Sequence, residues 1–266
     1  MIISHRQNIV FIHVPKCAGT SVRQLLRDWH DDPVPFDQSQ GHHPTLGLID
    51  YGHIPLFVLV EHFPHAWHAI RDYWSFAIIR DPFSRFASSL SQHLNMHSST
   101  PIRARSMGEI KEHLDRSINF LAKQPTGDHL LPPAFIHFQR QADYIQLNGE
   151  RVISTIYNIK NLDRLARDIC QATGGSPIAP DNLPGLPKAN TTYLYRTDTL
   201  RRLFNAMQPL SRRLGKVVPI SLKQSIYDRI YVPRDRKAQS LFKSRHVRDF
   251  VQSYYADDFR FLELES

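Results

Sequence analysis

A lysine, a glycine and two hydroxyl residues stand close together near the start of the chain, at Lys16, Gly19, Thr20 and Ser21. These residue types suit the binding of an anionic group such as phosphate. Lysine supplies a full positive charge, hydroxyls donate hydrogen bonds, and glycine allows close backbone approach or an unusual dihedral angle. In a Walker A loop the lysine follows the last glycine directly, whereas Lys16 precedes Gly19. The spacing therefore disfavours an ATPase or GTPase built on that loop.

A second set of residues with the same chemistry follows a later apolar run. The run begins at Trp74 and ends at Arg80, and Ser88 follows within the next helical pattern. A guanidinium and a hydroxyl placed in this way can bind one phosphate between them. Arg85 lies between the two and could equally brace the helix. Two phosphate sites suit a ligand phosphorylated at both ends of one ribose, which favours a bisphosphorylated adenosine over ATP.

Each set needs a strand that leads directly into a helix. The apolar run 10–14 predicts a buried strand, and the apolar spacing over 22–29 predicts a helix after the loop. The run 74–79 predicts a second strand, with Asp81 as the cap of the following helix and Pro82 at its first position. Ligands of open α/β sheets bind where strands end and helices begin. The two sets are therefore expected at one edge of a sheet.

The rest of the chain adds further helices and a strand to this arrangement. The pattern predicts helices over 106–123 and 161–174, the second with Asn161 as its cap, and a strand over 151–157. We expect one domain over residues 1–266 with a P-loop-like three-layer α/β fold. In that fold a central, mainly parallel sheet carries helices on both faces.

Composition and charge restrict the class of partner. The chain has 266 residues, 41% of them hydrophobic, and a formal net charge of +8, so it can form a sizeable core and attract anions. A polyanionic nucleotide and an acidic glycan would both satisfy this charge. Nucleic acid would satisfy it too, but no motif that combines basic and aromatic residues is present, so we expect no nucleic-acid partner.

The two cysteines, Cys17 and Cys170, are too few for a disulfide framework and favour a reducing compartment. Cys17 lies beside Lys16, where nearby positive charge could lower its pKa. The apolar run 54–60 is too short to span a membrane, and no signal peptide is evident. We therefore expect a cytoplasmic protein without a transmembrane segment.

The segment Pro15-Lys-Cys-Ala-Gly-Thr-Ser21 resembles the 5′-phosphosulfate loop of sulfotransferases that use 3′-phosphoadenylyl sulfate (PAPS). The resemblance is to the carbohydrate sulfotransferase group, sulfotransferase family 2, which includes heparan 2-O- and chondroitin 4-O-sulfotransferases. The Arg-Asp-Pro-x-x-Arg-x-x-Ser run resembles the 3′-phosphate site of that family. The resemblance implies that the 5′-phosphosulfate is held by Lys16, Cys17, Ala18, Gly19, Thr20 and Ser21, and the 3′-phosphate by Arg80 and Ser88.

The same family carries its catalytic histidine in a Gly-His pair between the two motifs, which corresponds to His53 here. An unperturbed histidine has a pKa near neutrality and can accept the proton of an acceptor hydroxyl. Glu61 and His62 are alternative bases. Lys16 is expected to act in catalysis as well, by stabilising the bridge oxygen of the departing phosphosulfate.

Later segments extend the resemblance. Lys188 and Asn190 resemble the segment that closes over the nucleotide, although turn chemistry explains them equally well. The run 255–259 resembles the Tyr-x-x-Asp-Phe ending of these domains, for which packing is the expected role. Family members often have a glutamate where Lys160 stands, so no function is assigned to that position.

Three histidine groups could suggest a metal site: His42 with His43, the series His62, His65 and His68, and the pair His93 and His97. None has a matching cysteine or carboxylate cluster, so no metal is expected. The expected co-substrate is PAPS, with adenosine 3′,5′-bisphosphate (PAP) as product and a hydroxyl acceptor, foremost a carbohydrate. The alternatives are a P-loop-like kinase that uses ATP and magnesium, or a non-catalytic domain that binds a nucleotide or nucleic acid.

Overall fold

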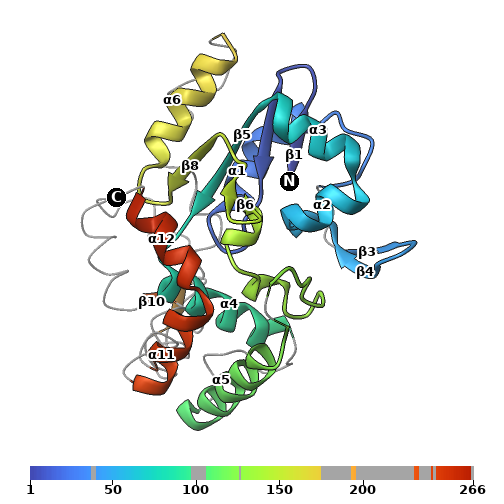
Figure 1. The fold of residues 1–266 in the computed structure, drawn as a ribbon. Helices are drawn as coiled ribbons and strands as arrows, with labels where there is room; N and C mark the ends of the chain where they lie inside the picture. Colours follow the sequence, from blue (N-terminus) through green and yellow to red (C-terminus); the bar gives the residue numbers. More distant parts are fainter. Residues whose placement is uncertain are drawn as a thin grey trace, which may run out of the picture.

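The computed structural model describes residues 1–36, 40–96, 106–125, 127–174, 241 and 244–264, together with two short strands at 193–195 and 231–233. Within this part of the chain, strands of a central sheet alternate with helices along the sequence (Figure 1). The structure is therefore a mixed α/β fold, as the alternating sequence pattern predicts.

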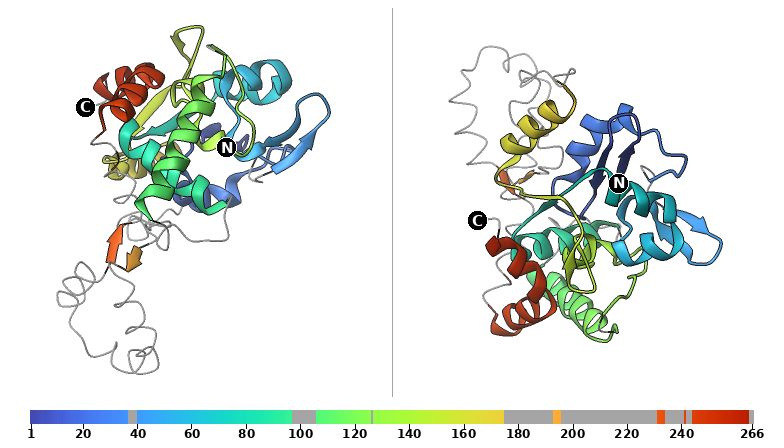
Figure 2. Two further views of the ribbon diagram at one scale, coloured as in Figure 1. Left: turned by 90° about the horizontal axis from the view of Figure 1, so that it is seen from below. Right: turned by 45° about the horizontal axis from the view of Figure 1, so that its top comes forward.

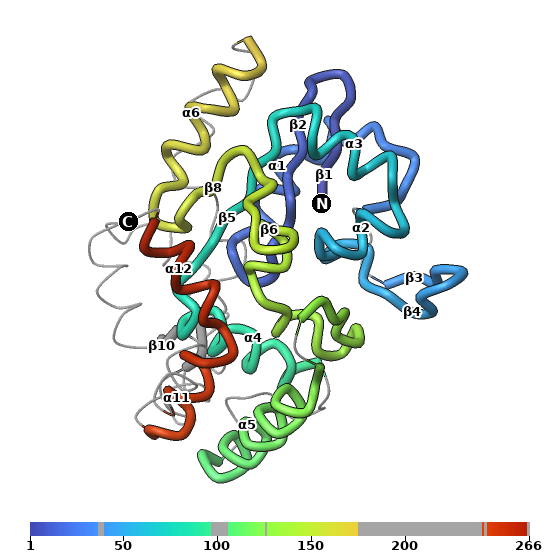
Figure 3. Tube along the Cα trace, viewed as in Figure 1, coloured from blue at the N-terminus to red at the C-terminus, as the bar shows by residue number. Residues whose placement is uncertain are grey.

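The central sheet has four strands in the order β1-β2-β5-β8. Strand β1 (Ile2–Ser4) pairs antiparallel with β2 (Ile9–Ile12), whereas β2, β5 (Trp74–Ile79) and β8 (Thr155–Asn158) run parallel. The predicted strands at 10–14, 74–79 and within 151–157 are thus confirmed, and the sheet is mostly parallel. Because parallel strands end at the same edge, the segments that follow β2, β5 and β8 lie near one another (Figure 3).

Eight helices are described: α1 (Gly19–Leu26), α2 (Leu56–His62), α3 (Pro64–Asp72), α4 (Pro82–Met96), α5 (Met107–Ala122), α6 (Leu162–Ala172), α11 (Arg245–Tyr254) and α12 (Ala256–Leu264). Helix α3 packs against β2 and β5, and α6 packs against β8. Helices α5 and α11 both contact α4, and α12 follows α11 and runs back toward β8 (Figures 1 and 2). Helix α4 therefore links the sheet to this group of helices.

Two short hairpins, one further pair of strands and four 3-10 turns complete the described structure. The hairpins pair β3 (Gln40–His43) with β4 (Gly47–Asp50) and β6 (Gln146–Leu147) with β7 (Glu150–Arg151). Strands β9 (Tyr193–Tyr195) and β10 (Tyr231–Pro233) form a separate antiparallel pair. The turns are η1 (Arg27–Trp29), η2 (Tyr51–His53), η4 (Ile136–Phe138) and η5 (Ala142–Tyr144).

The start of α4 is fixed by the signals that the sequence provides. The Asp81 side chain accepts a hydrogen bond from the backbone N–H of Ser84 at 2.8 Å, and Pro82 occupies the first helical position. An N-cap of this kind stabilises a helix by about 1 kcal/mol. The helix therefore begins directly after Arg80, which leaves that arginine at the end of β5.

The predicted cap of α6 is wrong in its chemistry, although the helix itself is confirmed. Asn161 stands at the N-cap position, but its side chain makes no capping hydrogen bond. Instead Asn158 accepts a hydrogen bond from the backbone N–H of Lys160 at 3.1 Å, one turn earlier. The turn between β8 and α6 is thus stabilised from the strand end rather than from the cap position.

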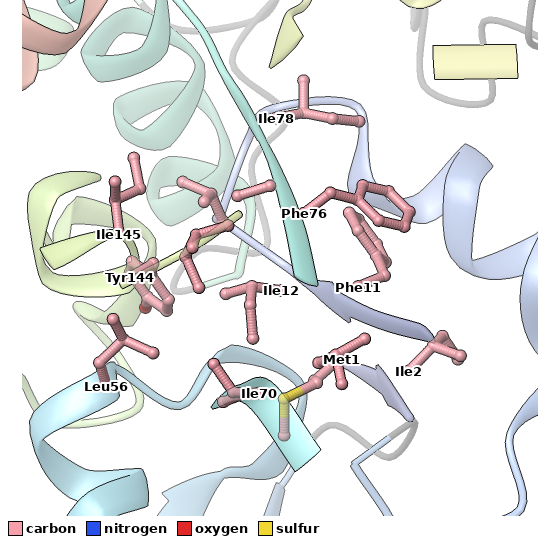
Figure 4. Packing of buried hydrophobic residues seen from close by; sticks show 14 of the residues in the cluster. Met1, Ile2, Phe11, Ile12, Leu56, Ile70, Phe76, Ile78, Tyr144 and Ile145 are labelled. Carbon is pink, nitrogen blue, oxygen red and sulfur yellow. The ribbon is translucent and has the colours of Figure 1, made fainter. Parts of the chain in front are cut away.

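Buried apolar side chains form two clusters. In the first, Phe11 and Phe76 stack across β2 and β5 with ring centroids 5.2 Å apart, and Leu56 and Tyr144 pack beneath the sheet (Figure 4). The second cluster joins α4, α5 and α11 through Phe86 and its neighbours. Full burial of a side chain of this size contributes about 1.5–3 kcal/mol. The two clusters pack the strands of the sheet and the helices that follow them, so the segments at the ends of β2 and β5 are anchored in the core.

Candidate active site

The loop between β2 and α1, residues 13–18, carries the first predicted anion site and is called the Lys16 loop below. Lys16 and Ala18 adopt left-handed backbone conformations, with φ of 66° and 63°. Ala18 is the N-cap residue of α1, and no side chain caps the helix there. The backbone N–H groups of a first helical turn have no partner within the helix and favour an anion. The loop therefore presents the start of α1 without a competing side-chain cap.

Hydroxyl residues often cap helices, but Thr20 and Ser21 do not cap α1, because the helix begins at Gly19, ahead of both. Thr20 is exposed, whereas Ser21 is buried. A residue inside the first turn cannot serve as the N-cap, since that position precedes the helix. The hydroxyls remain in the turn next to Lys16, where they were expected to contact phosphate.

Gly19 is required by a close contact within the protein. A Cβ atom at this position would lie 1.8 Å from Cδ2 and 2.1 Å from Nε2 of His13. Both distances are far inside van der Waals contact, so any side chain here would displace the His13 ring. The sequence predicted a close approach at Gly19, and the structure identifies His13 as the group that approaches.

The second predicted site adjoins the first. Arg80 follows β5, is partly exposed, and places Nη1 3.5 Å from the carbonyl oxygen of Lys16. Ser88 lies on α4 and is buried, with 8% of its surface exposed. The ends of two parallel strands thus bring Lys16 and Arg80 together, as their positions in the sequence predict.

A cavity of about 200 Å³ lies next to Arg80 at the ends of β5 and β8. It is lined by Arg80, Asp81, Ser84, Asn158, Ile159, Lys160 and Leu262. Ser84, Asn158 and Lys160 line this cavity although their sequence context did not predict them at the site. Their positions offered a signal, since β8 is a parallel strand and ligands bind beyond the carboxyl ends of such strands.

The Cys17 side chain belongs to the interior and not to the surface of the loop. Burial raises the pKa of the thiol to about 12, and nearby Arg85 and Arg80 only partly oppose this effect. Lys16 acts to lower this pKa, as its charge predicts, but desolvation outweighs it, so the expectation of a lowered thiol pKa is wrong. The thiol stays protonated and donates a hydrogen bond to Gln141 at 3.2 Å.

His53 ends the turn η2 and contacts the carboxylate of Asp50. Its Nδ1 atom lies 3.2 Å from Asp50 Oδ1, and the side chain is 12% exposed. The turn is held in place because Asp50 accepts the N–H of Gly52 at 2.9 Å and Tyr144 donates its hydroxyl to the His53 carbonyl at 3.2 Å. The ring orientation of His53 is thus fixed by a neighbouring carboxylate and a rigid turn.

Electrostatics keeps the His53 ring neutral near neutral pH. Burial lowers the pKa of His53 below its ordinary value of 6.5, and the carboxylate of Asp50 partly opposes the shift. For Asp50, burial acts to raise the pKa, but contact with His53 and neighbouring groups lowers it below 3.8. A neutral imidazole beside an ionised carboxylate can accept a proton.

Two more histidines pack against His53. The ring centroids of His13 and His137 lie 4.3 Å and 5.3 Å from that of His53. Burial lowers the pKa of His137 to about 3, with further contributions from His53 and Lys16. Burial also lowers the pKa of His13 well below 6.5. Because His13 in turn packs against Gly19, the His53 ring is connected by direct contacts to the start of α1.

The alternative bases lie in different surroundings. The side chain of Glu61 is 77% exposed and lies 3.7 Å from His62. The ring of His62 packs against His43 of the β3–β4 hairpin, with centroids 5.5 Å apart. His62 therefore contacts this hairpin, whereas His53 contacts His13 of the Lys16 loop.

The remaining predictions are placed as follows. His93 lies 2.7 Å from His113 on α5, while His97, Lys188 and Asn190 fall outside the described residues. Among the residues that the structure describes, no three His, Cys, Asp or Glu side chains are placed to hold a metal ion together. None of the described helices combines the length and apolar character that crossing a membrane requires.

Comparison with known proteins identifies the family of the chain. A family model described as "Sulfotransferase family" matches residues 1–265. The chain belongs to the sulfotransferase family. Neither the comparison with curated proteins nor that with solved structures found a match. Membership implies transfer of a sulfuryl group from a nucleotide donor, typically PAPS, to a hydroxyl acceptor.

Proposed function

We propose that this sulfotransferase transfers the sulfuryl group of PAPS to a hydroxyl of a carbohydrate. The observation that carries the proposal is the meeting of Lys16 and Arg80 at the ends of β2 and β5. Two cationic side chains on adjacent strand ends match the two phosphate groups of one bisphosphorylated nucleotide. A net charge of +8 on the whole chain favours approach of such a ligand.

In this proposal each donor group binds a different part of the nucleotide. Lys16 and the N–H groups around Cys17, Ala18 and Gly19 hold the 5′-phosphosulfate, with the hydroxyls of Thr20 and Ser21 beside them. Arg80 and Ser88 hold the 3′-phosphate. Lys188 and Asn190 are proposed to contact the same nucleotide. The cavity beside Arg80 offers space next to the guanidinium, and Asn158 and Lys160 also line it.

His53 is proposed to act as the base. Its Nδ1 atom faces Asp50, so a proton on that nitrogen leaves Nε2 as the acceptor. The acceptor hydroxyl attacks sulfur in line as its proton passes to Nε2 of His53. The bond between sulfur and the bridging phosphate oxygen breaks, and Lys16 stabilises the negative charge that develops on that oxygen.

We also propose that the architecture is P-loop-like, with three layers. The support lies in the parallel order β2, β5 and β8 and in the anion loop between β2 and α1. Helices α3 and α6 both pack on the parallel strands. A strand, loop and helix in this order place a helix start at the strand end, as phosphate-binding folds of this kind require.

Incubation of the sulfotransferase with PAPS and a panel of hydroxyl compounds tests the proposal. The panel should contain neutral and acidic sugars, tyrosine and simple alcohols. We expect a sulfated sugar and PAP in equal amounts, measured by mass spectrometry. A Lys16→Ala variant should lose turnover, whereas the variant Lys111→Ala, which replaces an exposed lysine of α5, should retain it.

Consumption of ATP with magnesium, with PAPS left unchanged, would favour the kinase alternative. Binding of PAP without turnover of any acceptor would favour a binding-only domain.

A further inference from the structure

One buried side chain contacts both predicted phosphate segments. Gln141 lies between the turns η4 and η5 and is fully buried. Its Oε1 atom accepts the backbone N–H of Arg80 at 2.9 Å, and its Nε2 atom donates to the Arg80 carbonyl at 2.9 Å. The Gln141 amide thus bonds both the N–H and the carbonyl of Arg80, which is the pairing that a neighbouring β-strand makes with one residue. Gln141 therefore holds the backbone of Arg80 just beyond the end of β5.

The same amide oxygen also reaches the Lys16 loop. The Cys17 thiol donates to Gln141 Oε1 at 3.2 Å, and the thiol stays protonated because burial raises its pKa to about 12. Cys17 directly follows Lys16 in the chain. One oxygen atom thus accepts hydrogen bonds from both segments, so the distance between them depends on the position of Gln141.

The position of Gln141 is itself fixed by a buried ion pair. Asp258 on α12 accepts the backbone N–H of Gln141 at 3.0 Å and that of Ala142 at 2.9 Å. Asp258 also pairs with Arg85 of α4 at 3.5 Å, and both side chains are fully buried. A buried charge requires such a partner, because an unpaired charge in the interior is strongly destabilising. The network therefore ties Gln141 to α4, the helix that carries Ser88.

We propose that Gln141 is a positioning residue that sets the spacing between the Lys16 loop and Arg80, so that one nucleotide engages both with its two phosphates. The proposal rests on the proposed function, which makes these segments the two phosphate sites. A ligand with two linked groups gains affinity from the second group only when the sites match its span. Gln141 sets the spacing of the two sites, because its hydrogen bonds reach both segments and its side chain is buried.

The test compares three ligands in calorimetric titrations: PAP, adenosine 5′-phosphate and adenosine 3′-phosphate. The variant Gln141→Met keeps the size of the side chain but removes its hydrogen bonds. We expect the affinity for PAP to fall at least about 10-fold, because the gain from linking the phosphates is lost. The affinity for each monophosphate should change by no more than about threefold, since each occupies a single site.

Gln139→Met is the matched control. Gln139 is a buried glutamine of the same segment, and its side chain bonds Leu131, His129 and Asp143 instead of the phosphate segments. This control should lower thermal stability but preserve the preference for PAP over the monophosphates. Equal losses for all three ligands in Gln141→Met, or no loss for PAP, would overturn the proposal.

A second variant applies if Gln141→Met fails to fold. Cys17→Ala removes the thiol that joins the Lys16 loop to Gln141, and Cys17→Ser restores a donor there. We expect a smaller loss in Cys17→Ala that is again confined to PAP, and partial recovery in Cys17→Ser. An unchanged preference for PAP in Cys17→Ala would contradict the proposal. If the wild-type chain does not prefer PAP to either monophosphate, the proposed function fails and the coupling fails with it. This outcome is seen in the wild-type chain, so it can be told apart from a change that appears only in the variants.

Discussion

Replacement of His53 by alanine is expected to lower kcat for sulfuryl transfer about 10²- to 10⁴-fold, the usual contribution of general acid–base catalysis. The affinity for PAP should stay within about twofold, because a base acts on the acceptor hydroxyl rather than on the nucleotide. The His53 side chain lies beside Asp50, His13 and His137, and His13 belongs to the Lys16 loop, so the PAP titration checks that the loop is intact in the variant. Steady-state rates and a PAP titration on the same preparation measure the two effects.

His62→Ala is the control for this variant, because His62 lies beside the β3–β4 hairpin. It should retain wild-type kcat. Full activity in His53→Ala would contradict the assignment and move the base to Glu61, His62 or another group. Parallel losses of kcat and PAP affinity would instead indicate that the His53 ring supports the fold of the Lys16 loop.

The pH profile gives an independent readout of the same base. His53 must be neutral to accept a proton, so kcat/KM should fall only as the pH drops through its pKa. Burial lowers that pKa below 6.5, which places the acidic limb of the profile below pH 6.5. Asp50 raises the pKa of His53, so in Asp50→Asn the limb should move to lower pH and kcat should fall as the ring loses its orienting carboxylate. If the acidic limb of the Asp50→Asn profile stays at the wild-type pH, Asp50 does not influence the pKa of the base, and its proposed role is wrong.

Replacement of Arg80 by methionine is expected to weaken PAP binding about 10- to 100-fold, the effect of one or two charge-assisted hydrogen bonds. Affinity for adenosine 5′-phosphate should change little, because this ligand lacks the 3′-phosphate assigned to Arg80. The substitution leaves the Arg80 backbone intact, and the two hydrogen bonds between Gln141 and Arg80 are made to that backbone. Calorimetric titration with both nucleotides measures the difference.

Arg116→Met is the control for the lost positive charge, since Arg116 lies on α5 with 66% of its side chain exposed. It should bind both nucleotides as the wild type does. Equal weakening of PAP and adenosine 5′-phosphate in Arg80→Met would refute the role of Arg80 at the 3′-phosphate. Such a result would place the guanidinium at the 5′ end, where its contact with the Lys16 carbonyl already lies.

The elements around both phosphate motifs could be predicted because their signals are local. Apolar runs define β2 and β5, and Asp81 with Pro82 defines the start of α4. The carboxyl ends of parallel strands share one edge, so the meeting of Lys16 and Arg80 followed from topology alone. Arg85 illustrates the limit of such reasoning. The sequence left its role open, and the structure shows it paired with Asp258 in the interior.

Contacts between distant parts of the chain could not be predicted from local patterns. Gln141 reaches Arg80, and Asp258 reaches Gln141, across separations of 61 and 117 residues. The cap of α6 was predicted wrongly because the side chain of Asn158, and not that of Asn161, accepts a backbone hydrogen bond in the turn before the helix. The raised pKa of Cys17 was missed for a related reason, since burial depends on the complete fold. Adjacent charge is visible in the sequence, but desolvation is not.

A single calorimetric comparison tests the central claim, that the Lys16 loop and Arg80 form one site for a bisphosphorylated nucleotide. The wild-type sulfotransferase is titrated with PAP in a chelating buffer, and separately with ATP in excess magnesium. We expect PAP to bind at least about tenfold more tightly than ATP, a difference of about 1.4 kcal/mol. Binding of ATP with magnesium in the absence of measurable PAP binding would contradict the account.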